Sequence, residues 1–278
     1  MIKTLYPDIQ NLALTSIVNG QNQYGETTDL AVVIERPITL FLNGQEIVTN
    51  MTIGDYPKYL AVGYLLNQNM LLPDDVITAI DYEDDLGVVV VRTERKTNFE
   101  EKLKKKTRTS GCAQGTVFGD VMEKFDTINL TSSVKIKASD IRVFTKAINT
   151  MDSLYLKAGA IHGCVLINKT EPVIYMEDVG RHNAIDKIAG YVFMNKIKTD
   201  DMVFYTTGRL TSEMVIKCVQ MGISILVSRS GFTEWGVDLA RKSGLTLIGR
   251  ARGERFTVLS GQERVIFDLE KKKKDSHA

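Results

Sequence analysis

The middle of the chain holds the pattern that most restricts how this protein can fold. Two apolar runs, residues 165–167 and 173–176, are separated by the turn-forming residues 168–172. A dense polar run follows at 177–183, and apolar residues then recur with helical spacing over 185–193. This pattern predicts two strands, a tight turn and a helix that packs by one face.

The polar run follows a strand and opens a helix, where α/β proteins bind ligands and where free backbone N–H groups attract anions. Two of the three histidines, His162 and His182, fall near it. As an alternative, Asp178 caps the helix and Arg181 and His182 are its solvated first turn. Spacing alone leaves both interpretations open. If the run is a site, its binding residues are Asp178, Gly180, Arg181, His182 and Asn183.

Composition excludes several classes of protein. The 278 residues are 44% hydrophobic and 25% charged, which suits one large or two modest domains. A net charge of +1 gives no general attraction to nucleic acid or membranes, and no apolar run approaches the ~20 residues that span a bilayer. The first residues lack the apolar segment of a signal peptide, and three scattered cysteines argue against a disulfide framework. We expect a cytoplasmic protein with reduced thiols and no nucleic-acid or membrane partner.

The first 95 residues are β-rich. Short strands are predicted at 31–35, 38–42, 46–49 and 88–91, and Asn43-Gly44 suits the tight turn of a hairpin. A helix that includes residues 60–65 is predicted to be capped by Asp55, with Pro57 in its first turn. We expect a β-rich N-terminal domain over residues 1–135.

A basic run at 102–108 leads into the segment Gly111-Cys112-Ala113-Gln114-Gly115. Glycines on both sides of a cysteine, after lysines that stabilise a thiolate, are typical of a mobile loop with a reactive thiol. We expect this loop at about 96–118, with Cys112 as its nucleophile. The alternative is a polar linker in which the cysteine is incidental.

Beyond a boundary near 132–139 the pattern is that of an α/β domain, which we expect over 136–270. A helix capped by Ser139 is followed by the central stretch and then by alternating strands and helices from 202 to 248. The alternation predicts a mixed, mostly parallel sheet with helices on both faces. Segments 256–259 and 265–267 are predicted to form a closing hairpin, and 271–278 a basic tail.

Several predicted loops pair glycine with arginine. Glycine lets a ligand approach the backbone, and arginine binds phosphate oxygens through two hydrogen bonds. If these loops share one sheet edge, they form a pocket for a polyphosphate or a dinucleotide. No Gly-x-x-x-x-Gly-Lys-[Ser/Thr] or Gly-x-Gly-x-x-Gly motif is present. Besides the polar run, the candidate binding residues are Gly208, Arg209, Ser228, Arg250, Ala251, Arg252, Gly253, Glu254 and Arg255.

The run Glu177-Asp178-Val179-Gly180-Arg181-His182-Asn183-Ala184-Ile185-Asp186-Lys187 closely resembles the signature of the formate dehydrogenase accessory sulfurtransferase family, FdhD/NarQ. The resemblance covers roughly residues 35–267. Further segments are similar to family segments in the right order, at 60–65, 159–162, 208–214, 237–240, 243–247 and 252–255.

The resemblance implies a sulfurtransferase that matures formate dehydrogenase. In this family a cysteine desulfurase loads a persulfide on a loop cysteine, here Cys112. The sulfur passes to the molybdenum cofactor, bis(molybdopterin guanine dinucleotide), before insertion into the formate dehydrogenase catalytic subunit. The resemblance also implies a cytidine-deaminase-like C-terminal domain and a homodimer. One departure is that Gly115 stands where the family commonly has a second loop cysteine.

Two other functions compete with sulfur transfer. Zinc-dependent deamination needs His-x-Glu and Pro-Cys-x-x-Cys, but here the chain has His162-Gly163-Cys164 and no Cys-x-x-Cys, so no zinc is expected. A non-catalytic carrier of the molybdenum cofactor would need no second loop cysteine, so Gly115 keeps it open. Cys164 and Cys218 fall at predicted core positions, and we interpret both as packing residues.

Overall fold

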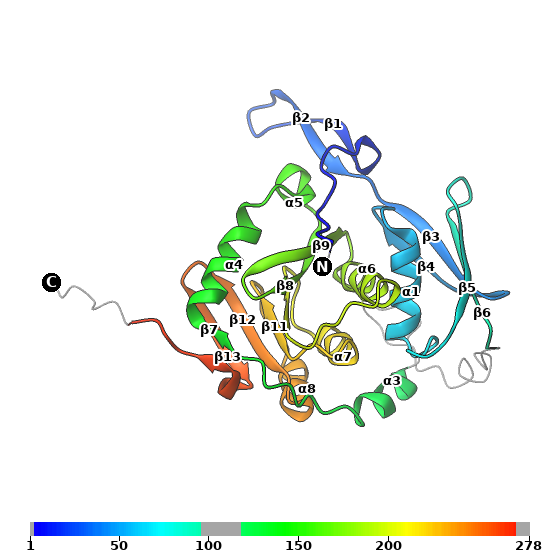
Figure 1. The fold of residues 1–278 in the computed structure, drawn as a ribbon. Coiled ribbons are helices and arrows are strands. Elements are labelled where there is room, and N and C mark those ends of the chain that lie inside the picture. Colours follow the sequence, from blue (N-terminus) through cyan, green and yellow to red (C-terminus); the bar gives the residue numbers. More distant parts are fainter. Residues whose placement is uncertain (1–2, 96–117, 271–278) are drawn as a thin grey trace.

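The computed structural model describes residues 3–95 and 118–270, with only the backbone given for 118–120. Cys112, most of the predicted loop and the tail 271–278 therefore lie outside the described residues. Two sheets dominate the described part, one of four strands and one of six (Figure 1). Helices α1 and α6 lie between them, as Figure 1 shows.

The N-terminal part is β-rich, as predicted. A two-stranded hairpin comes first, and a four-stranded sheet of order β4-β3-β6-β5 follows. The turn between β3 and β4 is at Asn43-Gly44, and Asn43 has a φ of 54°, so the predicted hairpin is confirmed. The elements are η1 (Leu12–Leu14), β1 (Thr15–Gln21), β2 (Thr27–Val33), β3 (Arg36–Leu42), β4 (Gln45–Thr52), α1 (Pro57–Asn67), β5 (Ile77–Glu83) and β6 (Val88–Thr93).

The start of α1 corrects one prediction. The helix begins at Pro57, but its N-cap residue is Tyr56, in left-handed conformation with no capping side chain. Asp55 was predicted to be the cap and instead forms an ion pair with Lys187 of α6. The predicted cap was wrong because the Asp55 carboxylate pairs with Lys187 instead of with the first N–H groups of the helix. Lys187 lies far along the chain, so sequence spacing does not reveal it as a partner.

The segment after residue 117 packs with the C-terminal core, although the N-terminal domain was predicted to run to 135. Val121, Phe125 and Leu130 belong to the same apolar cluster as α6, α7 and α8. Lys137 precedes the helix α4, whereas Ser139, the predicted cap, hydrogen-bonds Asp268. The elements here are α3 (Phe118–Phe125), β7 (Ile136–Lys137), α4 (Ala138–Thr150) and α5 (Leu154–Ala158).

The six-stranded sheet has the order β13-β12-β11-β10-β8-β9. It is mixed, as predicted, but not mostly parallel: only β10-β11 and β11-β12 pair in parallel. The prediction was wrong because β8-β9 and β12-β13 are hairpins and β8 pairs antiparallel with β10. The elements are β8 (His162–Asn168), β9 (Glu171–Asp178), α6 (Arg181–Met194), β10 (Met202–Thr206), α7 (Ser212–Gln220), β11 (Ile225–Ser228), α8 (Glu234–Ser243), β12 (Thr246–Arg252) and β13 (Arg255–Ser260).

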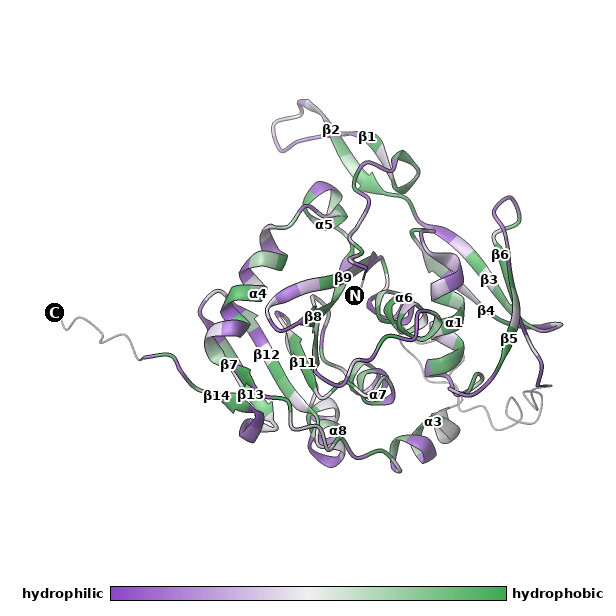
Figure 2. Cartoon of the chain, in the orientation of Figure 1, coloured by the Kyte–Doolittle hydropathy of each residue, from purple (hydrophilic) through white to green (hydrophobic). Residues whose placement is uncertain are grey.

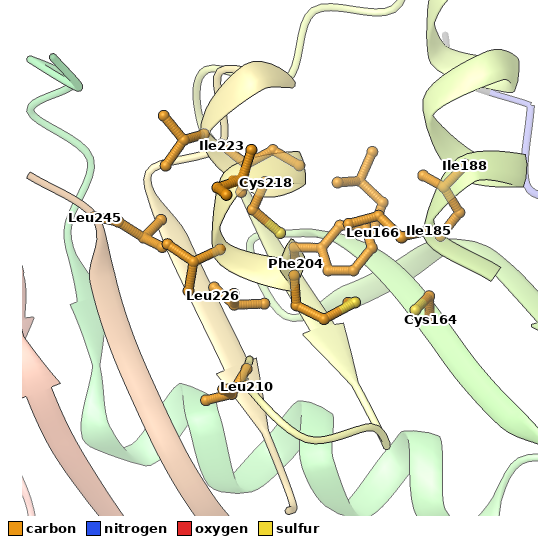
Figure 3. Close-up of a cluster of buried hydrophobic side chains, with 14 of the residues drawn as sticks. Cys164, Leu166, Ile185, Ile188, Phe204, Leu210, Cys218, Ile223, Leu226 and Leu245 are labelled. Atoms are coloured by element: carbon orange, nitrogen blue, oxygen red, sulfur yellow. The ribbon is translucent and has the colours of Figure 1, made fainter. Parts of the chain in front are cut away.

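Helices cover both faces of this sheet, as predicted, because apolar side chains alternate along its strands. Leu166, Phe204 and Leu226 point to one face, where they pack against α6, α7 and α8 (Figure 3). Their neighbours Val203 and Val227 belong to the opposite cluster, which α4 covers. The likeness to the cytidine deaminase fold stays a prediction.

The predicted closing hairpin is wrong. Residues 256–259 lie in β13, which pairs with β12 through a turn at Gly253-Glu254. The next strand, β14 (Val265–Ile266), instead pairs in parallel with β7. Both apolar runs form strands, as predicted, but they do not pair with each other. Strand pairing depends on the tertiary structure as well as on the local pattern.

Candidate functional site

The loops chosen from the sequence meet at one edge of the six-stranded sheet. Four strands end at this edge because they run in the same direction. Strands β10, β11 and β12 pair in parallel, and β9 runs the same way as β10 because both are antiparallel to β8. Hydrogen bonds link neighbouring loops: Thr207 N–H donates to Gly163 O at 2.9 Å, and the Ser228 hydroxyl donates to Gly208 O at 2.6 Å. The condition of a shared sheet edge is therefore met, while the single pocket formed by all of these loops stays a prediction.

A cavity of about 400 Å³ opens beside the first of these loops. The start of α6 together with His162 forms one part of its wall, and the edge strand β4 forms another. The floor comes from α1 and α7. The polar and charged lining residues are Glu35, Thr49, Asn50, Tyr64, Asn67, Gln68, His162, Arg181, His182, Asn183, Asp186, Glu213 and Lys217.

Asp178 faces inward rather than into the cavity. The side chain is fully buried, accepts hydrogen bonds from Gly180 N–H at 3.1 Å and Asn183 Nδ2 at 2.9 Å, and also accepts one from the Thr52 hydroxyl. Lys187 Nζ forms an ion pair with the same carboxylate. Asp178 is thus the support that fixes the loop before α6, which is a different role from ligand contact.

A second buried ion pair forms part of the cavity floor. Lys217 Nζ of α7 lies 2.7 and 2.8 Å from the two carboxylate oxygens of Asp186 in α6. Asn67 Nδ2 of α1 donates to the same carboxylate at 2.6 Å. Three helices are tied together at this point, so the shape of the floor depends on charges that are shielded from water.

The two histidines occupy different depths of the cavity. His182 is 9% exposed, and its Nε2 lies 3.0 Å from Glu213 Oε2. Burial lowers the pKa of His182 below 6.5; the Glu213 carboxylate opposes this effect, while Lys217 and Arg181 add to it. His162 is less buried, and burial together with Arg181 lowers its pKa as well. Both rings are therefore neutral near pH 7.

The strand β4 presents backbone groups to the cavity. Thr39 of β3 faces Thr49 of β4. The N–H of Thr39 donates to Gly87 O, so the backbone groups of Thr39 point toward β6 and not toward β4. Thr39 and Thr49 are therefore a non-hydrogen-bonded pair. The N–H and C=O of Thr49 therefore point away from β3, toward the cavity. Met51 O points the same way and accepts from Asn183 Nδ2 at 2.7 Å. Backbone donors and acceptors here suit the polar edge of a planar heterocycle.

The remaining candidates lie further along the sheet edge. Arg209, Arg250 and Arg252 are exposed; the Arg250 guanidinium lies 5.3 Å from the centre of the Phe232 ring, and Arg252 Nε donates to Arg229 O. Gly253 and Arg255 are exposed in the β12–β13 turn. In contrast, Ala251 and Ser228 are buried.

Glu254, predicted to be a binding residue, forms an ion pair with Arg142 of α4 at 2.6 Å. Gly208 is buried against Arg181, and a Cβ at residue 208 would come within 2.9 Å of the Arg181 side chain. This close approach packs the second loop against the first.

Cys164 and Cys218 are fully buried, as predicted. Both lie in the apolar cluster of Figure 3. Burial raises the pKa of the Cys164 thiol to about 12 and that of Cys218 well above its ordinary value. Neither side chain provides a thiolate at neutral pH.

Sequence reasoning missed the cavity floor and the β4 wall. A signal was present for part of the floor, because Asp186 and Lys217 are charged residues next to apolar residues in their helices. No local signal marked Thr49 or Asn67. A larger hollow of about 1070 Å³ lies elsewhere, against β5 and the end of α6, and contains none of the predicted site residues.

Two negative findings apply to the described residues, 3–95 and 118–270. No three histidine, cysteine, aspartate or glutamate side chains in them gather into a group that could hold a metal ion. A hydrolytic zinc site therefore has no ligand set in this part of the chain. The helices of the same part are all too short or too polar to cross a membrane.

Comparison with known proteins gives one consistent result. The sequence model of the FdhD/NarQ family matches residues 33–266. The chain is 30% identical to the sulfur carrier protein FdhD of Wolinella succinogenes over 261 residues, which is 92% of this chain and 90% of that protein. It is 28% identical to the protein of the same name from Bacillus pumilus over 246 residues, 88% of this chain and 94% of the relative.

A solved structure with the same arrangement comes from Desulfotalea psychrophila and is described as that of a formate dehydrogenase accessory protein. The two superpose with a TM-score of 0.73 at 26% identity, covering 91% of this chain and 98% of the other. The fold is therefore shared over nearly the whole length of both proteins.

Proposed function

The chain belongs to the FdhD/NarQ family, and we propose that it carries sulfur in the maturation of a formate dehydrogenase. In this proposal Cys112 accepts the sulfur from a cysteine desulfurase. The acceptor is bis(molybdopterin guanine dinucleotide), the molybdenum cofactor, before its insertion into the catalytic subunit. The names of the relatives, sulfur carrier protein and formate dehydrogenase accessory protein, support the general role.

The observation that carries the proposal is the burial of two of the three cysteines. Cys164 and Cys218 are inaccessible and their thiols are held protonated by burial. A sulfur carrier needs a nucleophilic thiolate within reach of its partner. Cys112, in a basic and glycine-rich segment outside the described residues, is the cysteine left for this role.

The loading step is a thiol–persulfide exchange. The Cys112 thiolate attacks the outer sulfur of the desulfurase persulfide, the S–S bond breaks, and the desulfurase cysteine leaves as a thiolate. Cys112 then holds the outer sulfur as its own persulfide. In the second step this sulfur passes to the molybdenum of the cargo while Cys112 leaves as a thiolate, and the reduced metal supplies the two electrons that convert the sulfur to sulfide.

The sheet edge fits an anionic nucleotide cargo. Arg181 lines the cavity, and its Nε is buried without a hydrogen-bond partner among the described residues. Arg209, Arg250 and Arg252 continue the positive charge along the edge. Guanidinium groups bind phosphate oxygens, while the outward backbone groups of Thr49 in β4 suit a heterocyclic ring. These residues would hold and orient the cargo, and the molybdenum would be the sulfur acceptor.

Intact-protein mass spectrometry tests the loading step. The protein is incubated with a cysteine desulfurase and L-cysteine, beside the variant Cys112→Ala. We expect the mass of one sulfur atom to be added to the wild type and not to the variant. A wild type without added sulfur, or an adduct that survives in Cys112→Ala, would remove Cys112 as the carrier.

A non-catalytic carrier of the cofactor is the second candidate, because Gly115 leaves the loop with one cysteine. The two functions differ in the maturation of formate dehydrogenase. A sulfur carrier loses maturation in Cys112→Ala but still binds guanine nucleotide, whereas a passive carrier retains both. Measuring maturation and nucleotide binding on the same variant therefore separates them.

A further inference from the structure

Arg250 occupies a place in β12 where the backbone favours glycine. Residues 249 to 252 of β12 face residues 257 to 255 of β13, so three steps along one strand match two along the other. The extra residue makes a β-bulge, a feature that redirects side chains at sheet edges and beside binding sites. Arg250 has a φ of 54°, in the left-handed region that glycine adopts most easily. An arginine held in this conformation points to a role for its side chain.

The guanidinium of Arg250 lies over an aromatic ring. It is 5.3 Å from the centre of the Phe232 ring, within the range of a cation–π contact. The backbone N–H of Arg250 donates to Ser230 O at 2.9 Å, which ties this end of β12 to the loop that carries Phe232. Figure 2 shows β12 passing from apolar to hydrophilic residues toward the same end. Within the described part of the chain no carboxylate pairs with this exposed guanidinium, so its N–H groups remain available to a ligand.

The Phe232 ring is held by the packing around it. It fits beside β12 because residue 249 is glycine, and a Cβ there would come within 2.7 Å of Phe232 Cδ1. The ring is partly buried and also packs against the apolar cluster that α6, α7 and α8 share. Contacts with both the strand and the core fix the position of the ring, which can therefore support the guanidinium.

The backbone at Phe232 also holds a second arginine loop. Leu210 N–H donates to Gly231 O at 2.9 Å, and Leu210 and Phe232 form an isolated parallel β-bridge. Arg209, the residue before Leu210, is exposed at the same edge of the sheet. Phe232 thus lies where the loop of Arg209 meets the strand of Arg250.

We propose that Phe232 is a positioning residue that holds Arg250 ready to bind the phosphate groups of a guanine nucleotide. The inference rests on the proposed function, because it takes the arginine loops as the site for the nucleotide end of the cargo. A flexible side chain that becomes ordered on binding lowers the affinity. The bulge directs Arg250 and the ring restrains it, so less freedom is lost when the ligand binds.

The phosphate groups, rather than the base, are the part of the nucleotide that this pair of residues suits. The guanidinium of Arg250 covers the Phe232 ring, so that face of the ring is not open to a stacked base. Guanidinium N–H groups match the spacing of two phosphate oxygens. A diphosphate therefore gains the contact that the ring has prepared.

Calorimetric titration with GDP tests the role of the ring. Phe232→Leu keeps an apolar side chain but removes the ring, and we expect binding to weaken roughly 2- to 10-fold because the freed guanidinium must then be ordered by the ligand. Phe232→Tyr retains the ring and should restore the wild-type affinity. Phe193→Leu is the matched control: this phenylalanine is also partly buried but lies at the far end of α6, so GDP should bind as it does to the wild type.

The double variant Phe232→Leu, Arg250→Ala separates positioning from direct contact. If the ring acts through the guanidinium, the double variant binds GDP as weakly as Arg250→Ala alone. A further loss would mean that Phe232 contacts the nucleotide itself, which overturns the inference. Wild-type affinity in Phe232→Leu, with weakened binding in Arg250→Ala, would overturn the inference and leave the proposed function intact. Wild-type affinity in Arg250→Ala would overturn both the inference and the place of Arg250 in the nucleotide site.

Thermal unfolding of Arg250→Gly tests the bulge without any ligand. Glycine adopts the left-handed conformation at no steric cost, whereas alanine does not. Arg250→Gly should therefore unfold roughly 2 °C above Arg250→Ala, although both variants lack the guanidinium. Equal unfolding temperatures would show that residue 250 is not held in this conformation, and the inference would fall with it.

Discussion

Gly63 of α1 and Gly190 of α6 face each other where the two helices cross, and neither has room for a side chain. A Cβ at residue 63 would come within 1.7 Å of Asp186 O and 2.7 Å of Gly190 N. A Cβ at residue 190 would come within 2.0 Å of Tyr59 O. This contact between helix backbones holds α1 of the N-terminal part against the helix that opens at the cavity.

Gly63→Ala should therefore destabilise the protein. Alanine usually stabilises a helix relative to glycine by roughly 0.5–1 kcal/mol. Here the added methyl group meets backbone that cannot move aside, and we expect a net loss of about 3 kcal/mol, the upper part of the range for overpacking. Urea unfolding measures the loss. Gly231→Ala is the matched control, because nothing lies within 4 Å of its added Cβ. Equal stability of the two variants would contradict the contact.

The ion pair in the cavity floor makes a second prediction. Lys217→Met leaves the buried Asp186 carboxylate with Asn67 but without its cation, and breaking one side of a buried pair costs about 3–5 kcal/mol. The double variant Lys217→Met, Asp186→Leu removes both charges and should regain a large part of that loss. A double variant as unstable as the sum of the two single variants would show that the pair is not coupled.

Acidification should weaken the fold through His182. Burial holds the pKa of this ring below 6.5, so below pH 6.5 the unfolded chain takes up a proton that the folded protein does not. The free energy of unfolding contributed by His182 therefore falls as the pH drops from 6.5 toward the folded pKa. His182→Gln should show a flatter dependence in this window. Parallel stability curves for the wild type and the variant would contradict the prediction.

Thiol labelling should distinguish the three cysteines. With both buried thiols held protonated, native Cys112→Ser should react with an aromatic disulfide reagent only after unfolding. The wild type should show one additional fast-reacting thiol. Rapid labelling of the native Cys112→Ser variant would show that Cys164 or Cys218 is accessible and would weaken the assignment of Cys112.

Guanine nucleotide binding should depend on the arginines of the sheet edge. Arg181→Ala and Arg252→Ala each remove a guanidinium that is placed to bind phosphate, which is worth about 1.5–3 kcal/mol, or roughly 10- to 150-fold in Kd. Titration with GDP, followed by calorimetry, measures the change. Arg241→Ala is the control, since this exposed arginine lies in the last turn of α8 and forms an ion pair with Asp238 at 3.9 Å. Unchanged affinity in both test variants would remove these loops from the nucleotide site.

Much of the fold was predictable because its signals are local. The apolar alternation of β8 and β9, the helical spacing after Asn183 and the Asn43-Gly44 turn were all located correctly. The loops at the sheet edge were also predictable, since strands β10 to β12 run in one direction. Pairing was less predictable: the antiparallel partners of β10 and β12, and the partner of β14, depend on which edges remain free after the core has formed.

Most strands and helices, the family resemblance, the polar run at the start of α6 and the glycine-arginine loops could all be recognised from the sequence. Each of these depends on residues that are close together along the chain. The set of residues that surround the cavity, in contrast, depends on how distant parts of the chain pack together. Asp55 and Lys187 are 132 positions apart, and Asn67 and Asp186 are 119 apart, yet each pair is in direct contact. These contacts follow from the close crossing of α1 and α6, and a crossing of this kind is a property of shape that no local pattern encodes.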